Sequence, residues 1–356
     1  MKELVFVCAV SDDVRMHWEI RVFLKSLREN GYINSSHILV YYHSPVINPE
    51  WNTIQEEYPE SKIFFYKDED NILKTSKIFN YFPIIRPYIL KKHWEKHPYL
   101  EKCAIFYTDS DIIFLKKLDF SKFLNDENCY LSDTRSYLNS DYFDSKEKDV
   151  IPELLEEYKK KDVLNEAAQI CGITRKIIEE NKQNTGGAQY LLKNINSDFW
   201  ERVLNASLTI RMFLMDVNQK YMKGAPGNDK ENNGIQSWCA DMFAVQWLLW
   251  ADNQKCICPE ELNFSWSTDK IEQKNYILHN AGITSDGSIR VTKDNRAVRN
   301  EKGDVTFVNA PAFFKGAFIS SFPPKLHLIN IITHSESRNY FTSVYAENIL
   351  KSLYSN

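Results

Sequence analysis

Residues 104–114 read AIFYTDSDIIF, with an apolar run on each side of an Asp-Ser-Asp turn. The first run is typical of a strand buried on both faces of a parallel sheet. In open α/β sheets, ligands bind beyond the carboxyl ends of the strands, and Asp109 and Asp111 directly follow such an end. Two carboxylates separated by one residue can hold a hard divalent cation that also takes diphosphate oxygens. An Asp-x-Asp pair on a turn is more often merely solvated, but the flanking apolar runs favour a metal site.

The chain before this stretch alternates between strand and helix patterns. Residues 4–10, LVFVCAV, are continuously apolar, and residues 18–27 have a helical spacing that ends at Asn30 and Gly31. The alternation continues with a strand, a helix, a strand and a helix at 38–42, 51–58, 62–66 and 87–97. Repeated strand–helix–strand units predict a parallel sheet covered by helices, and therefore an α/β fold.

The chain after the Asp-Ser-Asp turn is less regular. Residues 145–182 are helical in pattern and highly charged, which favours a solvated insertion or lid. A strand is expected at 188–192, and helices are expected at 197–215, 235–250 and 343–354. We therefore expect four parts: 1–144, a helical insertion at 145–183, a further part at 184–323, and a C-terminal helical extension at 324–356.

The composition is that of an ordinary soluble globular protein. The formal net charge of −4 over 356 residues gives no electrostatic reason to expect non-specific binding of nucleic acid. The seven cysteines are odd in number and form no CxxC pair, which argues against zinc ribbons and disulfide scaffolds. Glycine-rich phosphate loops, HExxH and GxSxG are absent, so dehydrogenases, P-loop NTPases, zincins and α/β-hydrolases are disfavoured.

No run of residues approaches the length of a membrane span, and the N-terminus carries no long apolar region or small-residue cleavage site. We therefore expect no transmembrane segment. The expected location is the cytoplasm of a bacterium, or the host cytoplasm if the source is a virus. The sequence does not indicate an oligomeric state.

The layout resembles that of a GT-A fold glycosyltransferase, the nucleotide-sugar-dependent class with a Rossmann-like domain and an Asp-x-Asp motif. The resemblance spans roughly residues 4–323, and its architecture is more specific than any one motif. It implies a mixed Rossmann-like sheet flanked by helices. Residues 1–144 would be the nucleotide-sugar-binding half, and residues 184–323 the acceptor half with sugar and metal-site elements. It also implies that Asp111 binds Mn²⁺ or Mg²⁺ and that Asp109 contacts the metal or the donor.

Two further segments match donor-binding elements of that class. Arg86 precedes the helix that leads into the Asp-x-Asp strand, where these enzymes place a basic residue against the donor. Residues 184–190, NTGGAQY, resemble the Asn-x-Gly element under the donor sugar, because paired glycines let the backbone approach a ligand closely. A surface arginine and a simple glycine turn are the alternatives. The resemblance thus assigns donor binding to Asp109, Arg86, Gly186, Gly187 and Gln189.

The C-terminal half supplies the remaining candidates. His279, in ILHNAG, resembles the histidine that completes the metal site, although a lone histidine is usually packed or on the surface. Lys315, in FFKG, resembles the lysine that neutralises the leaving diphosphate. Asp241 lies where an apolar helix begins and is either a helix-start carboxylate or the base or sugar-positioning acid of the GT-A pattern. Trp238, three residues earlier, is a stacking platform for an acceptor sugar or base.

These assignments predict a metal-dependent hexosyl- or pentosyltransferase, with a retaining mechanism favoured. The donor would be a nucleoside diphosphate sugar, with UDP preferred, and the acceptor a hydroxyl of a glycan or a protein. A second hypothesis is transfer to a hydroxymethylated base in viral DNA, with phosphate contacts from the basic segment at 290–299. A third, from another class, is a non-catalytic sugar- or nucleotide-binding α/β module. The complete set of Asp109, Asp111 and His279 favours an enzyme.

Overall fold

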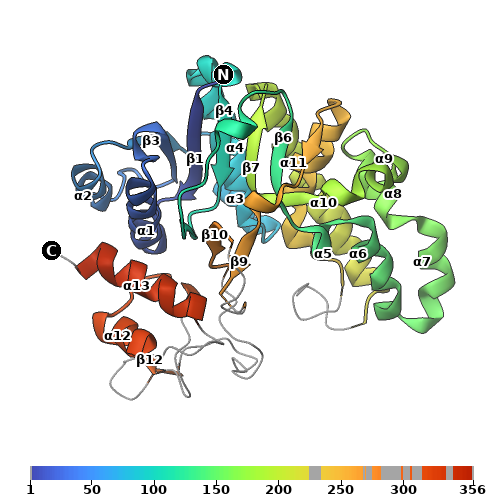
Figure 1. Cartoon of the computed structure of the whole chain (residues 1–356). Helices are drawn as coiled ribbons and strands as arrows, with labels where there is room; N and C mark the ends of the chain where they lie inside the picture. Colours follow the sequence, from blue (N-terminus) through green and yellow to red (C-terminus); the bar gives the residue numbers. More distant parts are fainter. Residues whose placement is uncertain are drawn as a thin grey trace.

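The protein is built on a seven-stranded mixed sheet (Figure 1). A computed structural model describes residues 2–223, 234–267, 269, 275–281, 298–299, 305–306, 315–333 and 340–354. In spatial order the strands are β3 (Lys62–Lys67), β2 (Ser36–Tyr42), β1 (Leu4–Ser11), β4 (Ala104–Thr108), β7 (Gly186–Lys193), β6 (Cys129–Asp133) and β8 (Cys256–Ile257). Strands β1 to β4 pair in parallel, whereas β7 runs antiparallel to β4 and to β6. The predicted α/β fold with a mixed sheet flanked by helices is confirmed.

Helices cover both faces of this sheet because its central strands are apolar on both sides. The even-numbered residues of β1, such as Phe6, pack with α1 (Val14–Asn30) and α2 (Glu50–Glu57). The odd-numbered residues, such as Val7, pack with α4 (Ile85–Lys96), α10 (Ser197–Tyr221) and α11 (Ala240–Ala251). Side chains of successive strand residues point to opposite faces, so one apolar run serves two cores. The short α3 (Ile72–Ile78) precedes α4.

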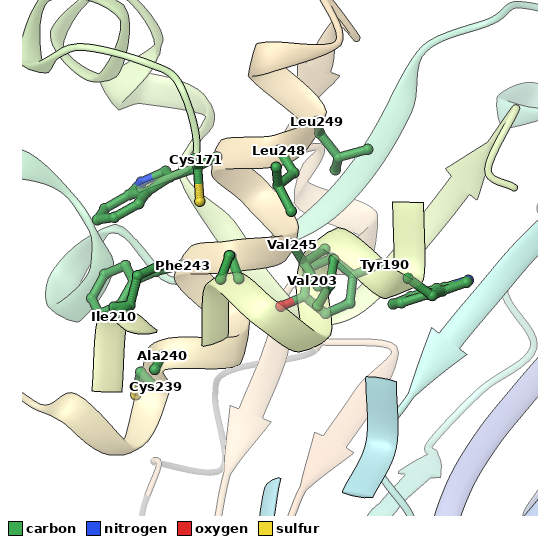
Figure 2. Packing of buried hydrophobic residues seen from close by; sticks show 14 of the residues in the cluster. Cys171, Tyr190, Val203, Ile210, Cys239, Ala240, Phe243, Val245, Leu248 and Leu249 are labelled. Carbon is green, nitrogen blue, oxygen red and sulfur yellow. The ribbon is translucent and has the colours of Figure 1, made fainter. Parts of the chain in front are cut away.

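The second of these cores includes the contact between α10 and α11. Figure 2 shows Val203 and Ile210 of α10 beside Phe243 and Val245 of α11, with Tyr190 of β7 near them. Each such side chain contributes about 1.5–3 kcal/mol when it is fully buried. This packing fixes the position of α11, whose first turn carries Asp241.

Helix α1 ends just before Gly31, as the sequence predicted. Gly31 has φ +78°, the left-handed conformation that glycine adopts without steric cost, and its N–H bonds to the carbonyls of the last turn. At the other end, Asp13 accepts a hydrogen bond from the Met16 amide at 3.1 Å. The helix therefore begins four residues before the predicted range and ends three residues after it.

A second, three-stranded sheet lies beyond the Asp-Ser-Asp turn. It consists of β5 (Ile112–Phe114), β10 (Ile277–His279) and β9 (Phe264–Trp266), with β10 in the middle. The C-terminal helices α12 (Lys325–Thr333) and α13 (Tyr340–Tyr354) pack with α1, β5 and β10 in a third apolar cluster. This cluster joins the C-terminal part of the chain to its first helix.

Short helices fill the region between β6 and β7. These are α5 (Arg135–Leu138), α6 (Ser140–Ser145), α7 (Leu155–Lys161), α8 (Val163–Gln169) and α9 (Arg175–Asn181), and in Figure 1 they lie on the side of the molecule away from α1 and α2. A two-stranded ribbon, β11 (Val298–Arg299) and β12 (Val305–Thr306), completes the elements. Among the described residues, no helix is both long enough and apolar enough to cross a membrane.

Two predicted helices have different bounds from those expected. The helix expected at 197–215 continues to Tyr221, and the one expected at 235–250 begins only at Ala240. Ser237–Cys239 forms a separate 3₁₀ turn, so Trp238 stands on that turn and not on the helix. The prediction treated the apolar run as one helix because periodicity does not distinguish a 3₁₀ entry from a first α-turn.

Candidate active site

The Asp-Ser-Asp turn joins the two sheets. Strand β4 ends at Thr108 in the main sheet, and β5 begins at Ile112 in the small one. In the small sheet His279 pairs with Ile112, and the Asn280 amide donates to the Asp111 carbonyl at 2.9 Å. This antiparallel register places a residue from the far end of the sequence beside the turn at the carboxyl end of β4.

Three side chains that could hold a metal ion meet there. His279 Nε2 lies 3.3 Å from Asp111 Oδ1 and 3.8 Å from Asp109 Oδ2, and one ligand atom from each of the three residues lies within 4.8 Å of the others. Asp111 Oδ1 is buried and, within the described part of the chain, has no hydrogen-bond partner. Such an atom is costly unless something satisfies it. Two carboxylates and one imidazole suit a divalent cation, and the structure brings together the three residues predicted to hold one.

Lys315, in the 3₁₀ turn Lys315–Phe318, forms an ion pair with Asp111 Oδ2. Burial opposes the ionisation of Asp111, but the Lys315 ammonium and the His279 imidazole hold the pKa of its carboxyl well below its usual range. The pKa of Lys315 is raised, because the attraction of Asp111 and Glu19 outweighs the effect of burial. Asp111 is thus ionised and already faces one positive charge.

Glu19 is a buried member of this region that sequence reasoning missed. It accepts a hydrogen bond from Ser110 Oγ at 2.7 Å, and burial raises its pKa. Its signal in the sequence was a carboxylate between Trp18 and Ile20, on the buried side of an otherwise apolar helix. A charged residue almost never stays fully buried without a partner, so a carboxylate at this position predicts a polar or charged neighbour.

Arg86 connects two carboxylates. It lies in the first turn of α4 and forms ion pairs with Asp109 and Asp241. Tyr81 donates to Asp241 Oδ1 at 3.1 Å and accepts from the Asp241 amide at 2.8 Å. Burial raises the pKa of Asp241 despite the nearby Arg86 guanidinium. The structure therefore places Arg86, Asp109 and Asp241 in one network, with Asp241 fully engaged.

The glycines of β7 have neighbours of their own. A Cβ at Gly186 would come within 2.5 Å of the Leu131 side chain and the Ser132 carbonyl, and one at Gly187 within 2.6 Å of Met242. The backbone contact therefore already requires glycine at 186, whereas at 187 the contact is with the end of a flexible methionine side chain. The predicted approach of the donor sugar to this strand stays a prediction. The next residue, Ala188, has φ +68°, a strained conformation for a residue with a Cβ.

The remaining candidates differ in exposure. Gln189 is fully buried between Ser132 and His279. Trp238 is 39% exposed and packs edge-on against Tyr81, with 6.0 Å between ring centroids. Trp238 therefore contacts Tyr81, which in turn hydrogen-bonds to Asp241. Most of the basic segment at 290–299, including Arg290, Lys293 and Arg296, falls outside the described residues.

Comparisons with known proteins give matches to solved structures alone. No family model and no curated protein matches the sequence. The chain is similar to the bifunctional glycosyltransferase WbbM, with 10% identity and a TM-score of 0.39 over 79% of this chain, but it spans only 46% of the length of WbbM. It is similar to mouse xyloside xylosyltransferase 1, with 12% identity and a TM-score of 0.38 over 78% of this chain and 98% of that one. An active-site mutant of LgtC matches with 11% identity and a TM-score of 0.43 over 78% of this chain and 88% of that one.

Proposed function

We propose that this protein is a metal-dependent glycosyltransferase that moves a sugar from a nucleoside diphosphate sugar, with UDP preferred, to a hydroxyl of a glycan or a protein. The observation that carries the proposal is the meeting of Asp109, Asp111 and His279 at the carboxyl end of β4. Nucleotides bind at this edge of α/β sheets, and the DSD sequence before a distant histidine resembles the GT-A pattern. A simple binding module would have no need of the complete set.

The proposed reaction exchanges one bond of the sugar for another. The bond between sugar C1 and the diphosphate oxygen breaks, a bond forms between C1 and the acceptor oxygen, and the acceptor hydroxyl loses its proton. Mn²⁺ or Mg²⁺ held by Asp109, Asp111 and His279 would neutralise negative charge on the departing diphosphate. Lys315, which lies against Asp111, supplies a further positive charge at the same place.

Asp241 has a positioning role in this proposal. Its carboxylate is engaged by Arg86 and Tyr81, so neither oxygen is free to take a proton without breaking that network. This favours retention of configuration, in which the departing diphosphate receives the acceptor proton. Trp238, exposed beside Tyr81, is the proposed platform for the acceptor.

The test is a donor screen with purified protein. UDP-, GDP- and TDP-sugars are incubated with Mn²⁺, with Mg²⁺ or with EDTA, and release of the nucleoside diphosphate is measured together with donor binding. Metal-dependent release from one nucleotide class is expected, and EDTA should abolish it. Binding of a nucleotide sugar without any turnover would instead support the binding module, and absence of binding would contradict both.

A further inference from the structure

A buried chain of hydrogen bonds runs behind the metal-site histidine. The Ser132 hydroxyl lies 2.7 Å from the Leu262 carbonyl oxygen and 2.8 Å from the side-chain amide of Gln189. The other end of that amide lies 3.5 Å from Nδ1 of His279. All three polar side chains are buried, so each group must find its partner within the protein.

Counting protons fixes the direction of this chain. The Leu262 carbonyl only accepts, so the single proton of the Ser132 hydroxyl goes to it. The Ser132 oxygen then has to accept from Gln189, and the NH₂ group is the part of that amide that donates. In the structure the amide oxygen Oε1 faces Ser132 and Nε2 faces His279, an orientation in which one hydroxyl would have to donate two protons. Amide oxygen and nitrogen are assigned from such networks, because the two atoms have nearly the same size.

We propose that Ser132 and Gln189 are positioning residues that hold His279 with its proton on Nδ1 and the lone pair of Nε2 directed at the metal. When the NH₂ group of Gln189 faces Ser132, the Gln189 oxygen faces Nδ1 of His279 and accepts its N–H. A metal-binding imidazole commonly donates its second N–H to an oxygen in this way. The inference rests on the metal site of the proposed function, and it gives Gln189 a role different from donor binding.

The opposite end of the imidazole fits this assignment. Nε2 is 3.3 Å from Asp111 Oδ1 and 3.8 Å from Asp109 Oδ2. With the proton on Nδ1, a cation bound among these atoms would satisfy the Nε2 lone pair and both carboxylates. Two aromatic rings fix the plane of the imidazole. Trp266 stacks on it with centroids 5.5 Å apart and planes at 20°, and Phe264 meets it edge-on at 5.2 Å.

The first test measures the proton itself. Wild-type protein with ¹⁵N-labelled histidine is examined by NMR without metal at pH 8, and His279→Gln identifies the signal of His279. Shifts typical of a protonated Nδ1 and an unprotonated Nε2 are expected. The reverse pattern would overturn the proposal, whatever the protein binds.

The second test measures Mn²⁺ affinity from the EPR signal of the free ion. Gln189→Leu should weaken binding about 10–100-fold, the usual effect of losing such a partner. Gln189→Glu keeps an acceptor for Nδ1 and should stay within a few-fold of wild type. Gln246→Leu is the control, because Gln246 is equally buried and donates to the Asn184 carbonyl at 3.0 Å.

The outcomes separate this proposal from the proposed function. If wild type binds no Mn²⁺, the proposed metal-dependent function fails, and the NMR result still decides the proton position. If wild type binds Mn²⁺ and Gln189→Leu binds equally or more tightly, the positioning role is wrong while the metal site stands. Melting curves for each variant show whether the altered proteins are folded.

Discussion

Buried histidines lie in two places in this protein, and the groups around them differ in charge. At the carboxyl end of β4, His279 faces Asp109 and Asp111. Between β2, β3 and α4, His37 Nδ1 lies 3.0 Å from His93 Nε2, and the other nitrogen of His93 lies 2.6 Å from the Tyr66 hydroxyl. Burial is similar in the two places, but in the second one both nitrogens of His93 and Nδ1 of His37 meet uncharged partners. Of the two places, the first sets a buried imidazole beside carboxylates, the combination of ligand types that suits a divalent cation.

The two places also differ in the charge of their buried side chains. Burial and the nearby positive charge lower the pKa of His37 from 6.5 to about 4, and burial with neighbouring histidines lowers that of His93 to about 2. Both imidazoles are neutral at physiological pH and contribute to the stability of the fold. The β4 edge instead gathers carboxylates, whose burial is offset by the Arg86 and Lys315 cations. The four predictions below test this division between a reactive and a structural cluster.

The largest effect is expected at Asp111. Asp111→Asn should lower transfer by ~10²–10³-fold, the usual cost of losing one electrostatic group of an active site. Because Asp111 is buried against Lys315, it should also lower the free energy of unfolding by about 1–3 kcal/mol. Transfer assays and urea unfolding measure the two effects. Asp252→Asn, which removes an exposed partner of Arg202, should change neither, and full activity of Asp111→Asn would exclude the metal role.

Arg86 comes next. Arg86→Gln leaves the carboxylates of Asp109 and Asp241 without their shared cation and should cost about 2–4 kcal/mol at pH 7. Burial already raises the pKa of Asp241, and without the Arg86 guanidinium this carboxyl should take up a proton at a higher pH, which removes the unpaired buried charge of the variant. The difference in stability from wild type should therefore narrow toward pH 4 in urea unfolding experiments. A difference that grows with acid would show that the network is not electrostatic.

Protonation of the buried pair His37 and His93 should change the stability of the protein and not its transfer activity. The folded-state pKa of His37 is depressed, so the unfolded chain binds the proton first, and stability falls as the pH drops from 6.5 to about 4. Over that range wild type should lose about 2–3 kcal/mol through this residue. His37→Gln should lose less, with transfer at pH 7 unchanged. His43→Gln, at an exposed position, is the matched control. An equal loss of stability with falling pH in the two variants would contradict the assignment.

The smallest effect is expected at Trp238. Trp238→Ala should weaken acceptor use by about 10-fold or less, in line with the loss of one stacking contact, and change the melting temperature little because the ring is 39% exposed. Steady-state kinetics with varied acceptor would show the loss in KM. Tyr99→Ala removes an exposed aromatic ring ahead of β4, at the other end of that strand, and should leave KM unchanged.

Sequence reasoning found the elements that carry their own signal. Strand β1, helix α1 with its Gly31 end and the Asp-Ser-Asp turn were predicted within a few residues, because apolar runs and left-handed glycines act locally. Strand β6 was missed, and so was the three-stranded sheet. The strands of the small sheet have three residues each, too few for a measurable periodicity, and their existence depends on partners far away in the chain.

The site shows the same limit. Asp109 and Asp111 were found from the turn, whereas His279 came only from a family resemblance, since nothing local links residue 279 to residue 111. Glu19 and the proton arrangement of Gln189 depend on three-dimensional neighbours, such as Ser110 and Ser132. Such contacts are set by packing, so neither spacing nor composition reports them.

The pairing of β5 with β10 also has a consequence for synthesis of the protein on the ribosome. About 160 residues separate the end of β5 from the start of β10, which at ordinary translation rates is on the order of 10–30 s. During that time the first four parallel strands can fold, but the acidic turn has no histidine and no Lys315 beside it. The nascent N-terminal half is therefore expected to be a folded sheet that lacks a complete metal site. The reactive centre is assembled only when the last quarter of the chain emerges.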